Sequence, residues 1–92
     1  MSPDPTVREI RAEISALDRS IVEAVNARVD LVARLREYKR ENGLPFLDPD
    51  RERELIAELE RFNGGPLSDE GVRELVTGVL ELTKRELERG GS

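Results

Sequence analysis

One helical pattern that runs unbroken over residues 5–42 constrains the fold of this chain more than any other feature. Its apolar side chains recur at spacings of three and four, with one gap of seven, at Val7, Ile10, Ile14, Leu17, Ile21, Val25, Val32 and Leu35. At 1.5 Å per residue, such a helix is about 57 Å long. Two shorter helices in a chain of 92 residues cannot cover it. We therefore predict that a second copy of the chain packs along this apolar stripe.

Turn signals divide the rest of the chain into two further helices. Asn42-Gly43 ends the first helix, and Asp48 is placed as the N-cap of a second helix, with a proline at the first helical position. The Asn-Gly-Gly-Pro run at 63–66 ends that helix, and Ser68 caps a third. The predicted fold class is all-α, with three helices per chain. We expect one domain over residues 1–92, with 1–6 and 89–92 flexible.

The composition narrows the chemistry that the chain can perform. Histidine and cysteine are absent, which excludes a Ser-His-Asp triad, a thiolate nucleophile and the commonest transition-metal ligands. A formal net charge of −5, with one Tyr, two Phe and no Trp, argues against nucleic-acid binding. There is no apolar run long enough for a membrane span and no leader-like segment. We therefore expect a cytoplasmic protein that binds neither nucleic acid nor membrane.

Two cations lie on the apolar stripe, where apolar side chains are expected. Arg28 occupies the gap between Val25 and Val32, and Lys39 continues the stripe four residues after Leu35. A charge on a core face is unfavourable unless it is paired or binds a ligand of opposite charge. The two positions therefore predict either built-in ion pairs or a site for an anion.

The beginnings of the first two helices add to this cluster. Arg51 and Glu52 lie one turn before the apolar face of the second helix, and Asp48 lies beside the free N–H groups at its N-terminus. Arg11 adjoins the stripe, and in an antiparallel dimer it lies near the middle or far end of the partner's helix. Basic side chains also snorkel from apolar faces, and Glu52 alone can neutralise a nearby arginine. The spacing of the whole set favours a pocket for a small anion.

These residues resemble the all-helical class of chorismate mutases, over about Val7 to Leu87. The resemblance is most specific at Leu17-Asp18 after Arg11, Ala27-Arg28, Lys39, and Asp48-Pro49-Asp50-Arg51-Glu52. It implies an intertwined helical homodimer and an isomerase that converts chorismate, a small dianion, to prephenate in phenylalanine and tyrosine biosynthesis. It also implies no cofactor and no metal, because the Claisen rearrangement is concerted and transfers no proton.

By this resemblance, Lys39, Arg28 and Glu52 are the expected catalytic residues. The arginine that matches Arg28 binds a substrate carboxylate, and the lysine that matches Lys39 contacts a carboxylate and the ether oxygen. The segment that matches Asp48 to Glu52 supplies the contacts to the ring hydroxyl and, at Arg51, a further cation. Substrate binding is thus expected to involve all five residues.

The resemblance implies three more substrate-binding positions. Arg11 matches an arginine that reaches into the partner's active site, and Thr83 matches a small hydroxyl residue on the third helix. Leu87 stands where the family has a Gln or Glu that contacts the ether oxygen, between Glu86 and Glu88. The side chain of leucine forms no hydrogen bond, which leaves three alternatives. The helix register shifts, Lys39 alone contacts the ether oxygen, or the activity is reduced. An isochorismate-pyruvate lyase on the same scaffold and a weak or inactive helical dimer are the alternatives.

Overall fold

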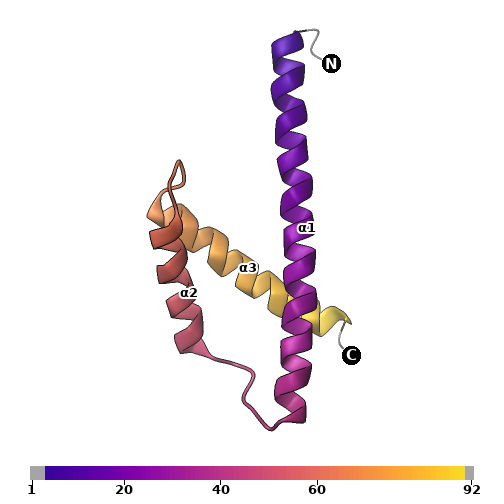
Figure 1. Cartoon of the computed structure of the whole chain (residues 1–92), viewed down its shortest axis with the longest axis vertical. Coiled ribbons are helices and arrows are strands. Elements are labelled where there is room, and N and C mark those ends of the chain that lie inside the picture. The colour runs from indigo at the N-terminus through magenta and orange to yellow at the C-terminus, as the bar shows by residue number, and fades with distance from the viewer. Residues whose placement is uncertain (1–3, 91–92) are drawn as a thin grey trace.

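The computed structural model describes residues 4–90, which form three helices and no strand (Figure 1). Their bounds are Pro5–Glu41 for α1, Pro49–Phe62 for α2 and Asp69–Gly90 for α3. The predicted all-α class with one very long first helix is therefore confirmed. Of the ends that we expected to be flexible, residues 1–3 and 91–92 lie outside the described part, whereas residues 5–6 and 89–90 belong to helices.

Residues next in sequence to α1 define both of its ends. At the N-terminus, the Asp4 carboxylate accepts a hydrogen bond from the backbone N–H of Thr6 at 2.8 Å. At the C-terminus, Asn42 is the capping residue, and Gly43 follows with a φ of +65°. A residue with a Cβ rarely adopts that left-handed conformation, so the glycine allows the chain to leave the helix axis. The predicted Asn-Gly stop is thus present.

The predicted caps of the two shorter helices are present as well. The Asp48 carboxylate accepts from the backbone N–H of Arg51 at 3.0 Å, with Pro49 at the first helical position of α2. Ser68 Oγ accepts from the backbone N–H of Gly71 at 2.9 Å, just inside α3. The bond between Asp48 and the backbone of Arg51 thus fixes the end of the connection to the first turn of α2.

α3 is the central helix of the protomer, since it packs against both α1 and α2. In Figure 1, α3 crosses α1 obliquely in the C-terminal half of α1, and the N-terminal half of α1 extends beyond the other helices. The buried residues of the described chain all belong to α3: Val72, Val76, Thr83 and Leu87. This small core therefore belongs to the helix that contacts both of the others, while α1 and α2 do not pack against each other.

The protomer is much more extended than a folded chain of its size. Its radius of gyration is 17.2 Å and its extents are 58 × 31 × 15 Å, whereas a compact domain of this length has a radius of gyration of about 12 Å. Its accessible surface is 7440 Å², against about 5400 Å² for a typical monomer of this mass. The excess accessible surface is area that a compact fold of the same mass would bury.

Much of the exposed apolar surface lies on α1. Within Pro5–Glu41 no residue is buried, and the stripe residues Ile10, Ile14, Leu17 and Ile21 are each at least half exposed. Contiguous exposed apolar surface of this kind marks an interaction site. Among residues 4–90, no helix combines the length and the hydropathy that a bilayer crossing requires.

Candidate active site

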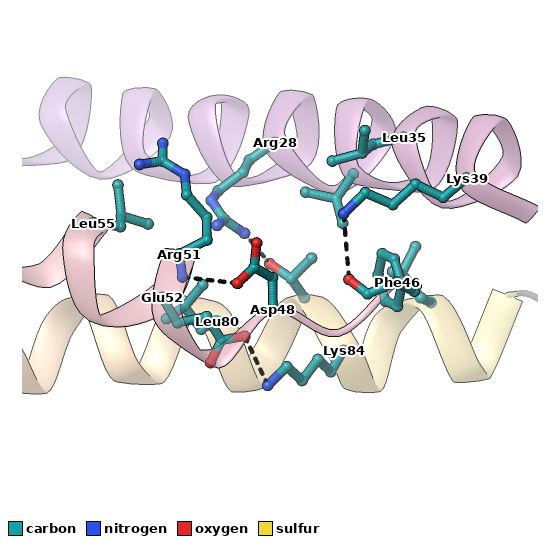
Figure 2. Close-up of a pocket in the computed structure, with 13 residues that line it drawn as sticks. Arg28, Leu35, Lys39, Phe46, Asp48, Arg51, Glu52, Leu55, Leu80 and Lys84 are labelled. Atoms are coloured by element: carbon teal, nitrogen blue, oxygen red, sulfur yellow. Dashed lines mark hydrogen bonds and ion pairs between the residues drawn. The ribbon is translucent and has the colours of Figure 1, made fainter. Parts of the chain in front are cut away.

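A pocket of about 370 Å³ opens between α1, the 42–48 connection, α2 and α3 (Figure 2). Its walls include every residue that we predicted for the site except Arg11: Arg28, Lys39, Asp48, Arg51, Glu52, Thr83 and Leu87. Residues far apart in the sequence meet here because the α2–α3 hairpin folds back against the C-terminal half of α1.

Arg28 is held in the pocket by a hydroxyl on α3. Its Nη1 donates to Thr83 Oγ1 at 2.7 Å, and Thr83 in turn donates to the carbonyl of Val79 at 2.7 Å. Thr83 is only 2% exposed, so its two bonds fix its rotamer. With its single proton given to Val79, the hydroxyl acts as an acceptor that orients the guanidinium.

Lys39 lies three turns further along α1 and points into the same pocket. Its ammonium donates to the carbonyl of Phe46 in the loop, at 3.5 Å, which is long for such a bond. An ammonium carries three donors, so this single weak contact leaves Lys39 able to bind an anion. Figure 2 shows the Lys39 side chain extending from α1 toward the carbonyl of Phe46.

The first turn of α2 contributes three charged residues with different surroundings. Asp48 serves as the N-cap described above. The Arg51 side chain is 58% exposed, and its guanidinium lies 3.9 Å from Glu58, a contact that constrains it little. The Glu52 side chain is 33% exposed, and its carboxylate lies 3.0 Å from the ammonium of Lys84 on α3. Arg51 is therefore available to a ligand, whereas Glu52 already has a cationic partner.

The pocket has a positive formal charge, although the protein as a whole is acidic. Four cations (Arg28, Lys39, Arg51 and Lys84) face two carboxylates (Asp48 and Glu52), which gives a formal charge of +2, against −5 for the whole chain. The rest of the wall is largely apolar, with Val32, Leu35, Phe46, Leu55, Leu80 and Leu87. Cations above a low-dielectric wall focus the field on a small anion. No group of three or more metal-ligating side chains occurs within residues 4–90.

The structure decides which residue of the last turns of α3 faces the pocket. α3 is continuous through Gly90, and Leu87 lines the pocket one turn after Thr83, at 5% exposure. Glu86 forms an ion pair with Arg89 outside it. In this chain α3 therefore presents Leu87 to the pocket, whereas Glu86 and Glu88 do not line it.

Arg11 does not reach the pocket of its own chain. It is exposed on the free N-terminal half of α1, about 26 Å along the helix axis from Arg28. The sequence missed one pocket residue with a charge, Lys84. Nothing in the local sequence pattern distinguishes Lys84 from the other cations of α3, because its partner Glu52 belongs to a different helix.

Comparisons with known proteins agree with this geometry. The family described as chorismate mutase type II matches residues 10–88. A bifunctional chorismate mutase/prephenate dehydratase of Aquifex aeolicus is 33% identical over 87 residues, which is 86% of this chain and 24% of that protein. A 4-amino-4-deoxychorismate mutase of Streptomyces venezuelae is 35% identical over 51 residues, 55% of this chain and 50% of that protein.

A solved structure extends the similarity to the whole fold. Form II of chorismate mutase from Thermus thermophilus superimposes with a TM-score of 0.85 at 32% identity, covering 92% of this chain and 97% of that one. By contrast, the chain spans only a quarter to a half of the two relatives above. The matched family, the helical architecture and the charged pocket together place this chain in the type II chorismate mutase family.

Proposed function

We propose that this protein is a chorismate mutase, which rearranges chorismate to prephenate. The observation that carries the proposal is the pocket charge of +2 beside an apolar wall. Chorismate is a dianion with an unsaturated ring, so its two carboxylates match the cations and its ring matches the wall. Family membership supports the reaction. The same family similarity includes mutases of 4-amino-4-deoxychorismate, and we propose chorismate as the substrate of this chain.

The reaction needs positioning and charge stabilisation rather than proton transfer. The C–O bond of the ether breaks while a C–C bond forms between the enolpyruvyl methylene and the ring, so the product is an isomer of the substrate. Arg28 and Arg51 hold the carboxylates so that the two reacting carbons are close. Lys39 stabilises the negative charge that grows on the ether oxygen as the C–O bond lengthens. Glu52 orients the ring hydroxyl, and Asp48 keeps the first turn of α2 in place.

The leucine at position 87 affects which side chains can contact the ether oxygen of the substrate. Since leucine has no donor, we propose that Lys39 alone provides the contact that a neighbouring Gln or Glu shares elsewhere in the family. The weak bond between Lys39 and the loop carbonyl leaves its ammonium available for this task. Leu87 then contributes only apolar surface against the ring.

We also propose that the working unit is an intertwined homodimer in the cytoplasm. The apolar stripe on the N-terminal half of α1 needs a cover, and the excess surface is roughly 2000 Å². Counted over both chains, this is about 4000 Å², an area typical of a permanent interface. In an antiparallel pairing, Arg11 of one chain approaches the pocket of the other and adds a third cation for the carboxylates.

Replacing Lys39 tests the proposed reaction and its mechanism together. We expect Lys39→Met to lower kcat about 1000-fold, because one preorganised donor to a developing oxyanion contributes roughly 3–4 kcal/mol. KM should change much less, since the arginines still hold the carboxylates. Chorismate loss is followed by absorbance, and the products are identified by NMR. An unchanged kcat would show that Lys39 does not stabilise the charge on the ether oxygen. If the unchanged protein releases pyruvate from isochorismate and forms no prephenate from chorismate, it is a lyase instead.

A further inference from the structure

Lys84 is a fourth pocket cation that the proposed mechanism does not use. Its ammonium lies 3.0 Å from Glu52 Oε2, and the side chains of Lys84 and Glu52 are 43% and 33% exposed. Figure 2 shows the pair along α3, on the opposite side of the pocket from Lys39 of α1. The pair therefore borders the part of the pocket that lies away from the cations of α1.

We propose that Lys84 makes the site select a substrate with a neutral hydroxyl over one with a cationic amine at the same ring position. The inference rests on the proposed function, in which Glu52 orients the ring hydroxyl. Two substrates of the family differ in this way: the name of 4-amino-4-deoxychorismate indicates an amine where chorismate has the hydroxyl. The rest of the two molecules, including both carboxylates, is the same.

The selection follows from the charge of the Glu52–Lys84 pair. A free carboxylate attracts an ammonium group strongly, whereas Glu52 has its charge compensated by Lys84. A substrate ammonium at Glu52 would lie close to a second ammonium and would be repelled by it. A hydroxyl donates one hydrogen bond to a carboxylate oxygen and requires no change in the ion pair. Lys84 therefore acts against the amine while leaving the hydroxyl contact in place.

The pair is suited to selectivity rather than to holding the fold. Partly exposed ion pairs contribute little to stability, so loss of the Lys84 charge should leave the helices in place. It should, however, lower the pocket charge from +2 to +1, which weakens the attraction for the two carboxylates that either substrate carries. Both substrates lose that general attraction, whereas only the amine escapes repulsion. The informative quantity is thus the ratio of kcat/KM for the two substrates.

The test compares Lys84→Met with the unchanged protein on chorismate and on 4-amino-4-deoxychorismate at pH 7 and low ionic strength. Methionine keeps the apolar stem of the lysine without its charge. We expect the ratio of kcat/KM, amine over hydroxyl, to rise about tenfold. Lys84→Arg should keep the original ratio. A matched control is Arg73→Met, which removes another α2–α3 ion pair, Arg73 with Glu60 at 3.4 Å, outside the pocket.

The outcomes separate this inference from the function on which it rests. A ratio within twofold of the original in Lys84→Met overturns the inference, and so does an equal rise in Arg73→Met. In both cases turnover of chorismate by the unchanged protein leaves the proposed function standing. If the unchanged protein converts no chorismate, both proposals fail together.

Discussion

The two halves of α1 carry one continuous apolar stripe but meet different surroundings. Residues 8–24 are all exposed, whereas residues 25–39 include half-buried positions that face α3 and the pocket. The stripe follows the helical period in both halves, apart from the gap of seven at Arg28 in the C-terminal half. Amphipathicity therefore predicts that this face is covered, but it does not predict by what. The C-terminal half is partly covered by the same chain, at positions such as Val25 and Val32, although Leu35 is still 48% exposed. The stripe residues of the N-terminal half stay at least half exposed, and in the proposed dimer the partner covers them. Arg11, the cation beside this part of the stripe, does not line the pocket of its own chain.

The largest expected effect comes from breaking the exposed half. Ile14 is 51% exposed in the protomer and lies in the interface of the proposed dimer. Ile14→Asp buries two unpaired charges per dimer, one on each chain. We expect the dimer dissociation constant to rise at least about 1000-fold, which corresponds to roughly 4 kcal/mol, with loss of helicity and activity. Sedimentation equilibrium and circular dichroism measure these changes.

The control for that variant places the same charge on the other side of the helix. Ala16 is two residues further along α1, about 200° around the axis from Ile14. Ala16→Asp should therefore remain dimeric, although aspartate is a weaker helix former than alanine. If Ile14→Asp forms dimers as tight as those of Ala16→Asp, the stripe is not the interface.

The next effect tests whether the exposed half serves the partner's pocket. We expect Arg11→Ala to stay dimeric and to lose roughly 10- to 100-fold in kcat/KM, as typical for a hydrogen bond to a charged group. Mixing it with Lys39→Ala, after unfolding and refolding together, gives mixed dimers in which one pocket has both Arg11 and Lys39. By the symmetry of such a dimer, about a quarter of the original activity should return. Activity equal to the average of the two separate variants would place Arg11 outside the pocket.

The sequence was informative wherever a structural feature depends on neighbours along the chain. The caps at Asp48 and Ser68 involve residues within three positions, and the cations Arg28 and Lys39 stood out because the helical period made them exceptions. The resemblance to the all-helical chorismate mutases, which these residues supported, is confirmed by the family match.

What the sequence left open depends on packing between helices. Glu86, Leu87 and Glu88 project in different directions from α3, and only the contact of that helix with α1 and α2 turns Leu87 into the pocket. The Glu52–Lys84 ion pair likewise joins two helices, so no local pattern announces it. The same holds for the hydrogen bond from Arg28 to Thr83, which joins the covered half of α1 to α3.

The smallest of these effects tests the covered half of α1 through that bond. Thr83→Val keeps the buried shape and removes the acceptor that orients the Arg28 guanidinium. Arg28 keeps its charge but loses its fixed direction, so KM for chorismate should rise about tenfold, the effect of one hydrogen bond to a charged group, with a smaller change in kcat. Steady-state kinetics give both values.

A matched variant on the same helix separates this orientation from a general effect of losing a hydroxyl. Thr77 is exposed on the other side of α3, so Thr77→Val should leave KM unchanged. Thr83→Ser restores the acceptor without the methyl group and should recover most of the loss in KM. If Thr83→Val and Thr77→Val behave alike, the hydroxyl does not position Arg28. If Thr83→Ser stays as impaired as Thr83→Val, the rise in KM comes from altered packing at position 83 rather than from loss of the hydrogen bond to Arg28. Arg28 is then oriented by the substrate alone.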